Sequence, residues 1–68
     1  MTKYLIYADG ERKPIRKFKR EYEAIEFASD FRNLADYGCM TVVRHQDDGS
    51  EDSWNMQNAT WEKVESNG

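Results

Sequence analysis

The chain has 68 residues, of which 38% are apolar and 34% are charged, so it is the size of one small domain, and its nine aromatic residues argue against disorder. No apolar run approaches the ~18 residues of a membrane-spanning helix, and no signal-peptide core is visible, so we expect a cytoplasmic, reducing setting without membrane contact. The single cysteine, Cys39, excludes an internal disulfide and a thiolate metal site.

The first predicted elements form a β-hairpin. Residues 3–8 are rich in aromatic and β-branched residues and predict a strand. Asp9-Gly10 predicts a turn, because glycine adopts positive φ without steric cost. Residues 14–19 predict the return strand. Because Pro14 has no N–H to donate, this strand either lies at an edge of the sheet or begins at Pro14. Along this strand Arg16 and Phe18 share one face, whereas Ile15, Lys17 and Lys19 share the other.

The next predicted element is a single helix over residues 21–37. Apolar residues recur in this segment at the i, i+3, i+4 and i+7 spacing, which creates one apolar face. This core face carries Ala24, Phe27, Ala28, Phe31, Leu34 and Ala35. The opposite face carries Glu26, Asp30, Asn33 and Asp36. Gly38 predicts the end of the helix.

A second hairpin is predicted after the helix. Residues 39–46 and 53–57 predict strands, and the segment between them contains a turn at 47–50. A loop of two or four residues gives one register, in which Val43 faces Trp54, Thr41 faces Met56 and His45 faces Asp52. The tail at residues 58–68 either adds a short strand or packs loosely, and residues 65–68 are expected to fray.

This order of elements predicts an α+β fold. We expect one domain over residues 1–68 with an antiparallel ββαββ arrangement, in which one amphipathic helix packs on a small sheet. Phe27, Phe31 and Leu34 should hold the helix against the sheet. The order of the two hairpins within the sheet is left open.

Charge is segregated along the chain. Six of the ten basic residues lie in one segment without an acid among them, and this basic segment consists of Arg12, Lys13, Arg16, Lys17, Lys19 and Arg20. Acids dominate residues 21–36 and again residues 47–52. A net charge of −3 therefore hides one positive and two negative regions, and such fields steer and select partners.

No pattern in the chain predicts a reaction centre. Cys39 and His45 would lie ~20 Å apart along one strand, which is too far for a nucleophile and its base. Cys39 is expected to be a small buried hydrophobic residue. The acidic turn at 47–52 lacks the ligand spacing of a calcium loop. We therefore predict no catalytic residue, no metal and no cofactor.

The two tryptophans have different expected roles. Trp54 is predicted to fill the core between the sheet and the helix. Trp61 lies in the tail, so it is the candidate for an exposed interface anchor, a role in which tryptophan is enriched.

One pattern resembles a known group of proteins. The spacing Phe18-x-x-x-x-Glu23-Ala24-x-x-Phe27-Ala28, then Gly38 and a β-branched strand, resembles small uncharacterised tailed-phage proteins of hairpin–helix–hairpin type. Within that group, residues 22–44 are similar to podophage inhibitors of host RNA polymerase, whose strand carries two alternating arginines that touch the polymerase. Val43 and His45 stand at those positions here, with Arg44 between them. The resemblance implies a host-directed binding protein of the host cytoplasm.

Together these patterns predict a non-enzymatic protein that binds and modulates or inhibits a larger host protein. A nucleic-acid-processing machine, such as a polymerase or a defence nuclease, is the favoured setting. The expected contact residues are Arg12, Lys13, Arg16, Lys17, Lys19, Arg20, Glu26, Asp30 and Trp61. Two alternatives remain: nucleic-acid binding through the basic segment, with phosphates as ligands, and a structural protein that self-associates through its edge strand. The overall acidity argues against nucleic acid.

Overall fold

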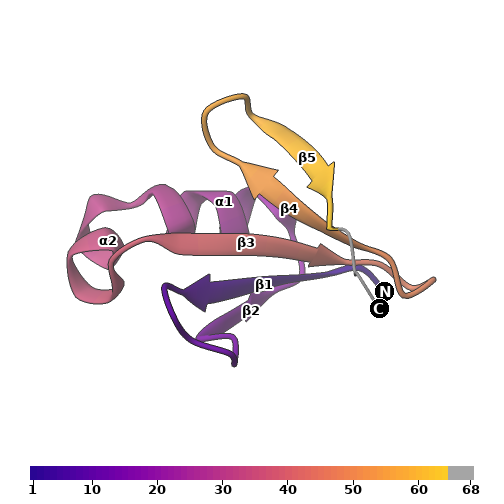
Figure 1. Cartoon of the computed structure of the whole chain (residues 1–68), viewed down its shortest axis with the longest axis horizontal. Coiled ribbons are helices and arrows are strands. Elements are labelled where there is room, and N and C mark those ends of the chain that lie inside the picture. Colours follow the sequence, from indigo (N-terminus) through magenta and orange to yellow (C-terminus); the bar gives the residue numbers. More distant parts are fainter. Residues whose placement is uncertain (65–68) are drawn as a thin grey trace.

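Residues 1–64, which are the part of the chain that the computed structural model describes, form one five-stranded antiparallel sheet and two helices (Figure 1). The elements are β1 (Lys3–Ala8), β2 (Arg16–Phe18), α1 (Glu21–Ser29), α2 (Phe31–Tyr37), β3 (Met40–His45), β4 (Glu51–Asn55) and β5 (Thr60–Lys63). The strand order is β2-β1-β3-β4-β5. The predicted antiparallel α+β class is confirmed, whereas the ββαββ detail is wrong by one helix and one strand. The expected fraying of residues 65–68 lies outside the described residues.

The core lies between α1 and the middle of the sheet. α1 packs across β1, β2 and β3. Ile6 and Val42 are direct neighbours on adjacent strands and are fully buried, where they meet Ala24 and Ala28 of α1. The two alanines leave room for a close approach of helix and sheet. Complete burial of side chains such as Ile6 and Val42 stabilises the fold by ~1.5–3 kcal/mol each.

The predicted single helix is interrupted at Asp30. This residue has an extended conformation (φ −71°, ψ 121°) and serves both as the last cap of α1 and as the N-cap of α2. Its side chain accepts a hydrogen bond from the Arg32 N–H (2.9 Å), which is the interaction that favours aspartate at helix N-caps. The helical phase restarts there, so the predicted core face is right for Ala24, Phe27 and Ala28 of α1 and wrong beyond Asp30.

Residues of α2 that were expected in the core are consequently at the surface. Phe31 is 79% exposed, and Leu34 and Ala35 are exposed as well. The expectation that Phe31 and Leu34 anchor a helix on the sheet is therefore wrong. α1 alone makes the main contact with the strands.

The register of the second hairpin differs from the prediction by one residue. Val43 pairs with Ser53, Arg44 with Asp52 and His45 with Glu51. The Gly49 N–H donates to the Gln46 carbonyl (3.0 Å) and Gly49 has φ 89°, so the turn is a three-residue loop closed by a left-handed glycine. Because an odd loop length shifts the pairing by one, the predicted contacts of Val43 with Trp54 and of His45 with Asp52 are wrong.

The tail adds a strand at the second edge of the sheet. β5 pairs with β4, and Trp61 lies directly opposite Trp54. The two indole rings are 5.0 Å apart, and Trp61 is partly buried against the core cluster. Of the two possibilities for the tail, the short strand is the one observed, and the expectation of a freely exposed Trp61 is corrected.

β2 forms the opposite edge, as the proline allowed, but it is only three residues long. Arg16 and Lys17 are exposed on it, while Ile15 just before it packs against the core. The Ile15 N–H donates to the Ile6 carbonyl (2.7 Å), and Ile6 is also the ladder partner of Arg16. Residues 15 and 16 both oppose Ile6, which interrupts the predicted alternation and turns Ile15 inward.

Candidate functional site

The basic segment occupies the β1–β2 loop, β2 and the connection to α1. All six of its basic residues are exposed, and none of them forms an ion pair within residues 1–64. The Arg16 guanidinium lies over the Phe27 ring, 5.7 Å from its centroid. Arg20 donates a hydrogen bond to the Tyr22 hydroxyl (3.3 Å). The positive charge of this segment is thus left available to an external partner.

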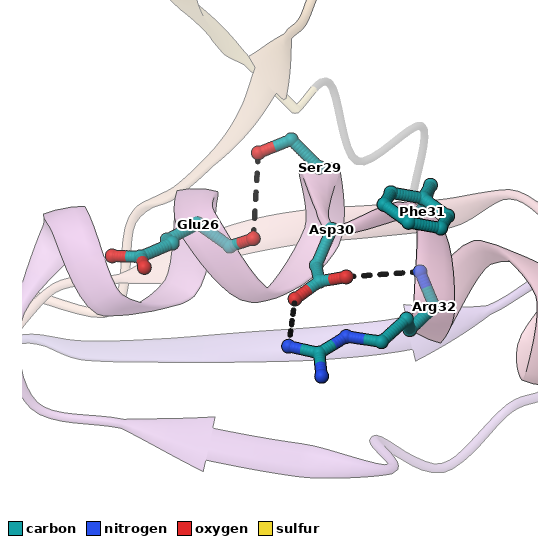
Figure 2. Close-up of a pocket in the computed structure, with 5 residues that line it drawn as sticks. All are labelled: Glu26, Ser29, Asp30, Phe31 and Arg32. Carbon is teal, nitrogen blue, oxygen red and sulfur yellow. Dashed lines mark hydrogen bonds and ion pairs between the residues drawn. The ribbon is translucent and has the colours of Figure 1, made fainter.

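The acidic residues predicted to make contacts lie at the junction of α1 and α2. Glu26 is exposed on α1, and Asp30 stands between the helices (Figure 2). The Arg32 N–H and guanidinium (3.4 Å) both donate to the Asp30 carboxylate. These hydrogen bonds hold the pKa of Asp30 below its usual range. Asp30 is therefore charged at neutral pH and fixed in orientation by the helix start.

A shallow hollow opens at this junction. Its volume is about 510 Å³, and it is lined by Glu26, Ser29, Asp30, Phe31 and Arg32, as Figure 2 shows. The Ser29 hydroxyl bonds back to the carbonyls of Ile25 and Glu26, which ends α1 at this point. Phe31 borders the hollow with most of its ring in solvent. An exposed aromatic ring beside the fixed Asp30 carboxylate suits contact with another macromolecule.

A second recess lies between β2 and α1. It has a volume of about 290 Å³ and is lined by Phe18, Glu23, Glu26, Phe27, Asp30 and Asn33. The Phe18 and Phe27 rings meet at 5.5 Å with their planes tilted by 50°. The Asn33 side chain donates to the Phe27 carbonyl (3.1 Å), which ties α2 to the end of α1. This recess, called the groove below, shares Glu26 and Asp30 with the hollow.

Trp61 belongs to a separate cluster on β3, β4 and β5. Asp52 accepts hydrogen bonds from the Arg44 guanidinium (2.8 and 3.0 Å) and from Gln46 (2.7 Å), and these hold the pKa of Asp52 below its usual range. Arg44 in turn lies 4.6 Å from the centroid of Trp61. The Trp61 N–H donates to Glu21 of α1 (2.6 Å). These hydrogen bonds and the ring contact hold β4 and β5 against β3 and α1.

Cys39 and His45 do not form a site in the described part of the chain. Cys39 is exposed, so the expectation that it is buried is wrong. His45 faces Glu51 (3.5 Å) across the hairpin rather than Asp52. Among residues 1–64, no group of three His, Cys, Asp or Glu side chains could hold a metal ion. No helix in that part of the chain is long and apolar enough to cross a membrane.

The structure groups the predicted contact residues only in part. Glu26 and Asp30 meet at the helix junction, the six basic residues line the β2 edge and its flanks, and Trp61 lies apart from both. The sequence interpretation missed Phe31 as a surface residue. The signal was present, since Ser29-Asp30 places two residues that favour helix ends inside the predicted helix.

Comparison with known proteins adds no relative. No family model, no curated protein and no solved structure matches the chain. The features of the molecule that bear on function are therefore its two charged surfaces and the exposed Phe31.

Proposed function

We propose that this protein is a non-enzymatic binding domain that docks on a larger protein and modulates or inhibits it. The observation that carries the proposal is Phe31, which is 79% exposed at the edge of a hollow with two carboxylates. Large aromatic residues with a polar surround are the typical anchors of protein interfaces.

The position of Phe31 is also fixed before binding. It is the first residue of α2, directly after the Asp30 N-cap, and that cap holds the Arg32 N–H at 2.9 Å. A side chain on an ordered helix start loses little backbone freedom when it docks, which favours affinity. A partner that covers Phe31 would remove its largely exposed ring from water, and burial of that apolar surface would favour binding.

The basic segment would serve the same partner in a different way. Exposed charges at the rim of an interface mainly raise the association rate. A partner with an acidic area next to a basic, apolar-lined one would match both surfaces. The resemblance to tailed-phage proteins supports a host protein in the host cytoplasm, and we propose a polymerase or a defence nuclease as the setting.

The decisive experiment compares binding by two variants that each lose an exposed apolar side chain. The tagged wild-type domain, Phe31→Ala and Met56→Ala are used for affinity capture from a bacterial lysate, with and without nuclease, and the captured protein is then measured by surface plasmon resonance. Met56 is 45% exposed in the β4–β5 turn and serves as the control. We expect Phe31→Ala to lose ~2 kcal/mol of binding free energy, mostly through faster dissociation. Equal binding by all three proteins would refute Phe31 as the anchor.

Nucleic-acid binding through the basic segment is the second candidate. The observation that favours it is that six exposed basic residues have no ion-pair partner within residues 1–64. If they contacted duplex DNA, the logarithm of the binding constant would fall with the logarithm of salt by roughly 0.9 per phosphate. Fluorescence anisotropy with Arg16→Glu plus Lys17→Glu tests this. Tight, steeply salt-dependent binding that the double variant abolishes would place this candidate first.

A further inference from the structure

The groove between β2 and α1 combines three features that suit one kind of ligand. Its floor is aromatic, because Phe18 of β2 and Phe27 of α1 meet there at 5.5 Å. Its helical wall carries the carboxylates of Glu23, Glu26 and Asp30. Its other wall is β2, the last strand of the sheet.

Within residues 1–64, one side of β2 has no strand partner. β2 pairs there with β1 alone, so its outer edge presents backbone N–H and C=O groups that an additional strand could use. A second copy of β2 is a poor candidate for that strand. Antiparallel pairing of two β2 strands about their midpoint would set Lys17 directly opposite Lys17 of the other copy, and like charges across a strand pair are destabilising.

Two carboxylates that line the groove have no cationic partner within the described residues. Glu23 and Glu26 form no ion pair within residues 1–64. Asp30 is already paired with Arg32 (3.4 Å), whereas the Arg16 guanidinium lies over the Phe27 ring and forms no ion pair in that part of the chain. An aromatic floor with carboxylates along one wall favours a cationic side chain, which is held by both.

We propose that an extended segment of a protein partner adds to the outer edge of β2 and places a basic and an apolar side chain, two residues apart, in this groove. The alternation of side chains in a strand brings such a pair to the same face. The basic side chain meets Glu23 and Glu26, and the apolar one packs on Phe18 and Phe27. This inference rests on the proposed function, because it describes how a protein partner is recognised.

The backbone edge and the carboxylates both favour polypeptide over nucleic acid here. Strand addition uses main-chain hydrogen bonds that a nucleic acid cannot supply in this geometry. Phosphates entering the groove would face three carboxylates, and like charges disfavour that contact.

The test uses a blocked synthetic peptide of sequence Arg-Thr-Val-Thr-Arg-Thr on the intact chain. A Glu-Thr-Val-Thr-Glu-Thr peptide and a short single-stranded oligonucleotide are the comparison ligands. Affinity is measured by isothermal titration, and the site is located from amide chemical shifts and contacts in NMR spectra. We expect only the arginine peptide to bind, with strand-type contacts and slower amide exchange at Arg16–Phe18.

Four single variants then test the roles of individual charges. Glu23→Gln and Glu26→Gln should each weaken peptide binding about threefold, as expected for exposed ion pairs, and together about tenfold. Asp36→Asn on α2 lines neither recess and should leave the affinity unchanged. Arg16→Ala should strengthen binding, because it removes the resident cation from the floor.

The inference is overturned if the arginine peptide binds neither the wild type nor Arg16→Ala, if the glutamate peptide or the oligonucleotide binds there instead, or if the peptide binds without contacts to β2. Each of these outcomes would reject the groove without testing Phe31, the residue that carries the proposed function. Phe31 does not line the groove, so loss of partner capture in Phe31→Ala together with a failed peptide test would retain the proposed function and reject this groove.

Discussion

Two arginines of this domain lie over aromatic rings, and their surroundings differ. Arg44 sits on the interior strand β3, 4.6 Å from the centroid of Trp61, and bonds Asp52 through two nitrogens. Arg16 sits on the edge strand β2, 5.7 Å from the centroid of Phe27, and has no ion-pair partner within residues 1–64. Both arginines contact an aromatic ring, but only Arg44 is also paired with a carboxylate, that of Asp52.

The difference shows that Arg44 has a structural role, whereas the charge of Arg16 is available to a ligand. A paired arginine in a partly buried position fixes the neighbouring strands, because its planar guanidinium meets an acid and a ring at once. An exposed arginine without an acid contributes little to folding and remains open to a ligand. Substitutions of the residues that contact Arg44 should therefore destabilise the fold more than substitutions at Arg16 or Phe31.

The largest effect is expected from Trp61→Ala. This change removes the ring that contacts Trp54, Tyr4 and Arg44, and it frees Glu21 from its hydrogen bond. We expect the free energy of unfolding to fall by ~3 kcal/mol, near the lower end for a core tryptophan because Trp61 is only partly buried. Urea unfolding followed by Trp54 fluorescence measures it. Trp61→Phe should lose much less, and an equal loss in both would assign the effect to the indole N–H alone.

A smaller, pH-dependent effect is expected from Asp52→Asn. Hydrogen bonds from Arg44 and Gln46 lower the folded pKa of Asp52 below its unfolded value. The charged form therefore stabilises the fold above the unfolded pKa, and this contribution is lost as the pH falls to the folded pKa. We expect Asp52→Asn to lower the urea midpoint at pH 7 and to match the wild type more closely in acid.

The control for that titration is Asp36→Asn, whose side chain makes no hydrogen bond within residues 1–64. Its urea midpoint should follow the wild type at every pH. A midpoint difference between Asp52→Asn and wild type that stays constant down to strongly acidic pH would contradict the pairing with Arg44.

Arg16→Ala should leave stability within ~0.5 kcal/mol of the wild type, as is usual for a surface substitution without satisfied partners. Arg44→Ala, measured in parallel by thermal unfolding, should be clearly less stable. Equal losses in the two variants would mean that Arg44 stabilises the fold through its contact with the Trp61 ring rather than through Asp52.

The smallest effect on folding is expected from Phe31→Ala. Because the ring is mostly in solvent, its removal should change the free energy of unfolding by less than ~0.5 kcal/mol. Chemical denaturation at 25 °C checks this. A loss of 3 kcal/mol or more, as for a core phenylalanine, would show that Phe31 packs inside the domain in solution.

Local patterns predicted much of the fold. The apolar strand at β1, the glycine that ends α2 and the apolar face of α1 all follow from short-range chemistry, and each is observed. The errors arise where one residue resets a pattern. Asp30 restarts the helical phase, and Gly49 sets an odd loop length, and neither choice can be read from periodicity alone.

The candidate site was predictable to a lesser extent. The basic segment is visible in composition, and Glu26 with Asp30 followed from their helical spacing. Phe31 and the groove did not follow from helical spacing, because both depend on the break between α1 and α2, for which Ser29-Asp30 is the one sequence signal. Trp61 was assigned to the surface because the tail has little periodic signal, while its partners Arg44 and Glu21 come from distant parts of the chain.

The three-residue loop between β3 and β4 also constrains how this sequence can diverge. If the loop kept its three-residue form, loss or gain of one residue at 47–49 would move β4 by one position against β3, and every β4 side chain would change faces. Asp52 would leave Arg44 for the opposite side of the sheet, and Trp54 would leave the core. In descendants of this chain the length of the turn should therefore be inherited unchanged. Asp48 should also be retained, because its carboxylate accepts hydrogen bonds from the Ser50 N–H (2.9 Å) and hydroxyl (2.7 Å) that hold the turn.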